Sequence, residues 1–112
     1  MAEPTKEIEF YITSDGKIPF NEWYESLKDK RAKLEVSRRL DRAAASNFGD
    51  HKGLVEHLYE MRITYGPGYR IYYTEKDGKI IVLFCGGDKK TQSQDIAKAK
   101  QYLIDYLGEE SL

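Results

Sequence analysis

The stretch Leu58–Cys85 decides the fold; it reads LYEMRITYGPGYRIYYTEKDGKIIVLFC. Its first segment alternates apolar residues (Tyr59, Met61, Ile63) with Glu60, Arg62 and Thr64. A second segment repeats the pattern, with Tyr69, Ile71 and Tyr73 set against Arg70 and Tyr72. A period of two is typical of half-buried strands, so both segments are predicted strands.

Two turn signals and one apolar run complete this stretch. Gly66-Pro67-Gly68 separates the two alternating segments, and Asp77-Gly78 is a pair that tight hairpins favour. Ile80–Cys85 is continuously apolar, which predicts a strand covered on both faces. The stretch therefore predicts a three-stranded antiparallel meander.

Outward from the meander, the periodicity predicts one strand and three helices. Residues 7–12 alternate as a half-buried strand, with Ile8, Phe10 and Ile12 inward. Pro19 suits the first turn of a helix ending at about Lys28, and Asp29 can cap a second helix that ends near Ser46. Thr91 and Gln94 match a capping box for a last helix. The predicted order is βααβββα, an α+β single domain over residues 1–112 whose antiparallel sheet is packed by a helical hairpin and a C-terminal helix.

Composition narrows the class of protein. Among 112 residues there is one cysteine, which excludes an internal disulfide and agrees with a reducing compartment. No window is apolar enough to span a membrane, and Met1–Lys6 lacks the pattern of a secretory signal, so we expect a cytoplasmic protein. The formal net charge is −1, so any surface for a polyanion must arise from the distribution of charge. Residues 28–42 hold such an excess, with seven Lys/Arg against three acids.

The polar face of the meander is the first candidate site. Glu60, Arg62, Arg70 and Tyr72 share the face opposite the apolar residues, and side chains on paired strands lie within about 5–8 Å. Lys89 and Lys90 follow the last strand at the same edge. Arginine forks match phosphate oxygens, and tyrosine can stack on a base, so the face suits a phosphodiester backbone. The alternative is an ordinary sheet surface, on which Glu60 neutralises the arginines as cross-strand pairs.

The second helix carries another candidate. Its face Arg31, Glu35, Arg38, Arg42 could follow RNA phosphates, or could be a solvated face with salt bridges around Glu35; the latter is favoured for the pairs near Glu35, and Arg39 and Arg42 stay open. The two histidines lack the spacing of metal ligands. Cys85 is predicted to be a buried thiol, and Trp23 a core anchor of the helical hairpin.

Five segments together resemble a known family. They are Phe20–Asp29, Asn47–Asp50, Glu60–Ile63, Tyr65–Tyr73 and Gly86–Gln92. In this order and spacing they resemble the HigB-like addiction module killer proteins. These are a branch of the RelE/ParE toxin superfamily also described as phage-derived Gp49-like. The likeness runs from about Ile8 to Leu107.

This resemblance implies a RelE-like fold and a toxin of a type II toxin–antitoxin system, a ribosome-dependent mRNA endonuclease that arrests translation without a cofactor. The implied partners are the ribosome, mRNA and a cognate antitoxin of the helix-turn-helix type, through which alone operator DNA is reached. Carried over residue by residue, Arg62, Arg70 and Lys89 are the implied catalytic residues. Tyr72 and Lys90 are weaker matches toward RNA, alongside Arg39 and Arg42.

The mechanism expected for such an enzyme is attack of a 2′-hydroxyl on the adjacent phosphate. Arg62 and Arg70 would stabilise the phosphorane because they stay charged. Lys89 would act as base or as a charge clamp, Asp88 is a second candidate base, and the acid is unassigned. This hypothesis needs both guanidinium groups to converge without being neutralised. The alternatives are a ParE-type DNA gyrase inhibitor on the same scaffold, or a non-catalytic relic acting as co-repressor with its antitoxin.

Overall fold

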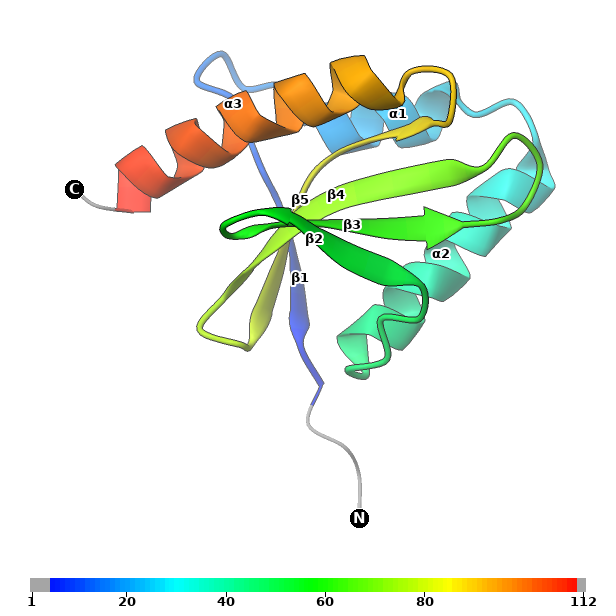
Figure 1. The fold of residues 1–112 in the computed structure, drawn as a ribbon, viewed down its shortest axis with the longest axis horizontal. Coiled ribbons are helices and arrows are strands. Elements are labelled where there is room, and N and C mark those ends of the chain that lie inside the picture. Colours follow the sequence, from blue (N-terminus) through cyan, green and yellow to red (C-terminus); the bar gives the residue numbers. More distant parts are fainter. Residues whose placement is uncertain (1–4, 111–112) are drawn as a thin grey trace.

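The computed structural model describes residues 5–110; residues 1–4, most of the segment searched for a secretory signal, and residues 111–112 lie outside them. The elements follow the order β1 (Glu7–Phe10), α1 (Pro19–Ser26), α2 (Lys30–Ala44), β2 (His51–Val55), β3 (Leu58–Ile63), β4 (Tyr69–Lys76), β5 (Ile80–Asp88) and α3 (Gln92–Glu110). The predicted α+β class is confirmed, with the three expected helices and the meander β3–β4–β5 (Figure 1).

The sheet has five strands in the order β1-β5-β4-β3-β2. The prediction of an antiparallel sheet is right for β2 to β5 and wrong for β1, which pairs parallel to β5. The α1–α2 hairpin and three further strands (β2, β3 and β4) separate β1 from β5, and β5 runs beside β1 in the same direction. The strand β2 was missed because HKGLV shows neither alternation nor a continuous apolar run.

Both faces of the sheet are covered, which explains where the core lies. On one face α1 and α2 pack Phe20, Ala32 and Val36 against strand residues that include Met61 and Ile71. On the other face α3 packs residues that include Leu103 and Tyr106 on Leu58, Tyr72, Val82 and Phe84. Residues 81–87 of β5 are buried throughout, as the apolar run predicts.

The first strand departs from its predicted pattern. It ends at Phe10 rather than at residue 12, and Phe10 and Ile12 are exposed although they were expected inward. Tyr11, expected outward, is buried in the core beneath α3. An alternating pattern shows which residues share a face, but here α3 covers the face that was expected to meet water.

Local signals place the starts of α1 and α2 well, whereas at α3 the described hydrogen bonds of Thr91 join it to Asp88 and Asp95 and not to Gln94 of the predicted capping box. Asp29 caps α2, because its side chain accepts a hydrogen bond from the backbone N–H of Arg31 (2.9 Å). Helix α1 begins at Pro19 as predicted and ends at Ser26, two residues before Lys28. Helix α2 ends at Ala44, and Ser46 then takes a left-handed backbone with φ 69°. In residues 5–110 we find no helix with the length and apolarity needed to cross a membrane.

Candidate functional site

The register of β3 and β4 brings two arginines directly opposite each other. Arg62 pairs with Arg70, and Glu60 pairs with Tyr72 two residues along. The prediction that these four residues share one face of the meander is therefore confirmed. Like charges directly opposite one another destabilise a sheet, so a cross-strand arginine pair needs anions nearby.

Arg70 lies against a fully buried carboxylate. Its Nε is 3.7 Å from Oε2 of Glu60, and its Nη1 donates to the carbonyl oxygen of Gly68 (3.0 Å). The Arg70 side chain is 13% exposed and that of Glu60 0%. The expectation that the Arg70 guanidinium is unneutralised is wrong. The alternative of a cross-strand pair with Glu60 holds at this position.

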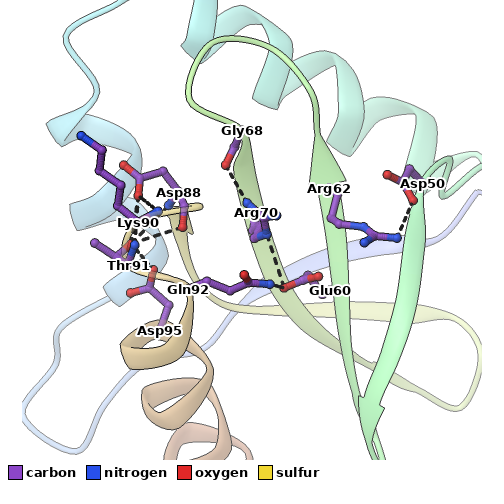
Figure 2. A network of polar contacts seen from close by, with 10 residues as sticks. All are labelled: Asp50, Glu60, Arg62, Gly68, Arg70, Asp88, Lys90, Thr91, Gln92 and Asp95. Atoms are coloured by element: carbon purple, nitrogen blue, oxygen red, sulfur yellow. Dashed lines mark hydrogen bonds and ion pairs between the residues drawn. The ribbon is translucent and has the colours of Figure 1, made fainter.

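Arg62 has a different partner in a more open place. Its Nη2 donates to Oδ1 of Asp50 at 3.0 Å, and the two side chains are 37% and 52% exposed. In Figure 2 the Arg62 side chain runs toward Asp50 and away from Arg70. An exposed pair of this kind contributes about 0–1 kcal/mol, so an incoming phosphate can replace Asp50. The expected free guanidinium is wrong for Arg62 too, and the expected convergence of the two guanidinium groups is not seen, but the partner of Arg62 is exchangeable.

Tyr72 is not on an open surface. Its side chain is fully buried beneath α3, so the expectation of an exposed ring that stacks on a base is wrong. Burial, and then the nearby Glu60 carboxylate, raise the pKa of Tyr72 far above its ordinary value. The hydroxyl therefore stays protonated at any physiological pH.

The turn between β5 and α3 brings one lysine to Arg70. A Cβ placed on Gly68 would lie 3.6 Å from Nη1 of Arg70 and 4.0 Å from Cβ of Lys89. Lys89 and Lys90 are both exposed, and Figure 2 shows the Lys90 side chain pointing away from Arg70. The structure thus brings the base of the Lys89 side chain near Arg70, whereas the end of Lys90 points away from it.

Asp88 has a structural task in the same turn. Its Oδ1 accepts hydrogen bonds from the backbone N–H groups of Lys90 (2.8 Å) and Thr91 (3.1 Å). The Thr91 hydroxyl bonds to the carboxylate of Asp95, one turn into the helix. Asp88 therefore orders the start of α3, which leaves it poorly suited to the role of base.

Arg39, expected on an RNA-binding surface, is buried. Its guanidinium donates to the carbonyl oxygens of Arg62 (2.5 Å), Phe48 (2.8 Å) and Asp50 (2.8 Å). Gly49 lies over it so closely that a Cβ there would meet the guanidinium at 2.8–2.9 Å. Burial, together with the charge of Arg42, lowers the pKa of Arg39. The prediction that Arg39 is exposed is wrong. Its hydrogen bonds connect α2 to β3 and to the segment that precedes β2.

A groove beside α2 holds the remaining arginines. Arg31 and Arg38 bond to Glu35 at 3.0 and 3.8 Å, which confirms the salt bridges expected on this solvated face. Arg42 is exposed. The groove lining has five arginines and three acids (Arg31, Arg38, Arg39, Arg42, Arg62; Glu35, Asp41, Asp50). It therefore carries positive charge in a chain whose formal net charge is −1.

Two partners at the site were missed or underweighted by sequence reasoning. Asp50 follows Gly49 in a segment without periodicity, so no sequence pattern indicated that its carboxylate would pair with Arg62. Gln92, whose Nε2 donates to Oε2 of Glu60 at 3.0 Å, is the first residue of α3 and lies far from Glu60 in the sequence.

Within residues 5–110 we find no cluster of three or more His, Cys, Asp or Glu suited to a metal ion. Cys85 is buried as expected, and burial raises the pKa of its thiol to about 12.

Two comparisons with known proteins gave matches. A family model described as phage derived protein Gp49-like (DUF891) matches residues 22–104. A Haemophilus influenzae protein described as uncharacterized is 42% identical over 91 residues, which is 81% of this chain and 91% of that protein. The residues matched by the family model contain every candidate site residue named above.

Proposed function

Starting from the fact that this chain belongs to the phage-derived Gp49-like family, we propose that it is a toxin of a type II toxin–antitoxin system. Its proposed activity is ribosome-dependent endonucleolytic cleavage of mRNA in the cytoplasm, which arrests translation. The observation that carries the proposal is the in-register pair Arg62 and Arg70 on one sheet face, with Lys89 beside Arg70.

Three cationic groups with different freedom support phosphate binding there. Arg70 is held from two sides, by Glu60 and by the carbonyl oxygen of Gly68, so it offers a fixed donor. Arg62 can exchange the exposed Asp50 for a phosphate oxygen. Lys89 is exposed and adds a mobile charge. The α2 groove, with the exposed Arg42, extends the positive surface beyond Arg62 toward further RNA phosphates.

The proposed reaction is a transesterification. The 2′-oxygen attacks phosphorus and loses its proton to a base, while the bond from phosphorus to the 5′-oxygen breaks and that oxygen gains a proton. The products are a 2′,3′-cyclic phosphate and a 5′-hydroxyl. Arg70 stabilises the extra negative charge of the phosphorane, and Arg62 joins it once its side chain leaves Asp50 and turns toward the phosphate. Lys89 is the proposed base or charge clamp, and in-line geometry imposed with the ribosome supplies much of the acceleration.

A cognate antitoxin, of the helix-turn-helix type, is the proposed partner that masks the toxin. Through it alone the complex would reach operator DNA. The test is co-expression with the product of the adjacent gene, which should relieve growth arrest and co-purify with this chain.

The activity is tested by inducing the protein and mapping mRNA ends by primer extension. Codon-phased cuts are expected with the wild type, and their loss with Arg62→Ala or Lys89→Ala. Lys79→Ala is the matched control, because Lys79 is an exposed lysine in the hairpin at the other end of β4 and β5. Arg70→Ala is a poor first test, because it leaves Glu60 buried without its cation. Cuts that persist in both Arg62→Ala and Lys89→Ala would overturn the site.

Two other outcomes identify the rival functions. Intact mRNA with a DNA-damage response would indicate a ParE-type inhibitor of DNA gyrase. Neither effect would indicate a non-catalytic co-repressor, a function favoured by the carboxylate partners of both arginines and by the net charge of −1.

A further inference from the structure

We infer that Glu60 is a positioning residue for the phosphate-binding face. Its buried carboxylate holds Arg70 on β4 and, through Gln92, the start of α3, which sets the separation between Arg70 and Lys89. This inference rests on the proposed function and adds a residue that acts through others.

The first support is the burial of Glu60. Glu60 is 0% exposed in the middle of β3. An apolar side chain at this position would be buried without the desolvation cost of a carboxylate. Replacing a buried ion pair by apolar residues is often neutral or stabilising, so packing alone gives no reason for a carboxylate here. Within the described residues its Oε1 meets no donor at full hydrogen-bonding geometry, and the Tyr72 hydroxyl, whose pKa is raised by burial and by this carboxylate, is a nearby polar group on the paired strand.

The second support is that one oxygen serves two elements. Oε2 of Glu60 accepts from Nε2 of Gln92 at 3.0 Å and lies 3.7 Å from Nε of Arg70. Figure 2 shows Gln92 and Arg70 converging on Glu60 from different elements. Gln92 is the first residue of α3 and Arg70 the second residue of β4. A single carboxylate therefore joins the strand of the fixed arginine to the helix that follows the lysines.

The third support is the position of the lysine turn. Lys89 and Lys90 lie between Asp88, the last residue of β5, and Gln92. On one side Asp88 binds the backbone N–H groups of Lys90 and Thr91. On the other side the Gln92–Glu60 bond anchors the helix start. The backbone of Lys89 is thus held at both ends, and one of these ends is set by Glu60.

Glu60 cannot itself touch RNA in this fold, because it is fully buried, so its effect must pass through Arg70 and Lys89. A purely structural role predicts only a change in stability. A positioning role predicts weaker phosphate contacts in a folded protein, and the same direction of change when Gln92 is altered.

The test is binding of a fluorescent single-stranded RNA made uncleavable by 2′-O-methylation, measured by anisotropy over a series of salt concentrations. The variants are Glu60→Gln, which removes the charge, and Gln92→Ala, which removes only the link to α3. Glu75→Gln is the matched control, because Glu75 is a β4 acid ion-paired at 3.1 Å with Lys6. Cooperative thermal unfolding of each variant verifies the fold, and Gln92→Ala, altered at the helix start, keeps the test open if Glu60→Gln fails to fold.

We expect Glu60→Gln to bind about tenfold more weakly, with the slope of log K against log salt reduced by about 0.7, the loss of one phosphate contact on a single strand. Gln92→Ala should weaken binding less, in the same direction, and Glu75→Gln should match the wild type. Wild-type affinity and slope in the folded variants would overturn the inference and leave the proposed function standing. A wild type that binds no RNA and cuts no mRNA would overturn both.

Discussion

Two arginines that face each other across β3 and β4 lie in different surroundings. Arg70, the inner arginine on the central strand β4, lies against the buried Glu60 near the start of α3, whereas Arg62, the outer arginine on β3, meets the exposed Asp50. The strand register places the two arginines opposite each other, but the position of α3 determines how accessible each guanidinium group is. The inner arginine is fixed and compensates a buried charge, while the outer arginine is reachable and replaceable.

The largest effect should come from removing the inner arginine. Arg70→Ala leaves Glu60 buried without its cation, so we expect the free energy of unfolding to fall by about 3–5 kcal/mol. Urea denaturation measures it. The double variant Arg70→Ala/Glu60→Gln removes both charges and should recover much of the loss. A single variant that loses less than about 1 kcal/mol would mean that the pair is not buried as described.

A third arginine sharpens the comparison, because Arg39 is buried against carbonyl oxygens. Arg39→Ala removes three hydrogen bonds from a charged donor, and water can reach some of the freed carbonyl groups. We expect a loss of about 2–3 kcal/mol, again measured in urea. Arg38→Ala, at the exposed neighbour on α2, is the control and should change stability by less than about 0.5 kcal/mol. Equal losses in the two variants would contradict the assigned burial.

The outer arginine should separate stability from activity. Arg62→Ala breaks only an exposed pair, so the free energy of unfolding should change by no more than about 1 kcal/mol. The proposed mRNA cleavage should nevertheless be lost in the primer-extension assay. Asp50→Asn is a useful companion, since it frees Arg62 and should keep or increase cleavage. A strongly destabilised Arg62→Ala protein would remove the contrast with Arg70.

The smallest expected effect on stability near neutral pH concerns the thiol of Cys85, which lies on the face of the sheet that α3 covers. Burial raises the pKa of the Cys85 thiol from 9.0 to about 12, so at pH 8 alkylation should be slow in the folded protein and fast in urea. The folded thiol holds its proton more tightly than the unfolded one. Cys85 therefore contributes stability that is complete below about pH 9 and is lost as the pH rises toward 12. Cys85→Ala should show a smaller fall of stability over that range, and rapid alkylation at pH 8 without urea would contradict this burial.

Sequence patterns predicted which residues share a face, because a period of two is independent of the rest of the chain. They did not predict what lies on that face, because the position of α3 over Glu60 and Tyr72 depends on packing between elements distant in sequence. A usable signal for Arg39 was present. Arg39 follows Ala32 and Val36 at helical spacing and precedes Ala43, so its burial was readable in the apolar stripe. Asp50 offered no such signal.

The parallel pairing of β1 with β5 has a consequence for how the chain assembles. Glu7 pairs with Ile80, about two thirds of the chain length later in the sequence, whereas β2 to β5 are joined by short turns. Contacts between distant residues form slowly because a long loop must close first. Pulsed hydrogen exchange should find β3 and β4 amides protected before those of β1. During synthesis β1 leaves the ribosome first and stays unpaired at that stage. The sheet is completed only after β5 has left the exit tunnel.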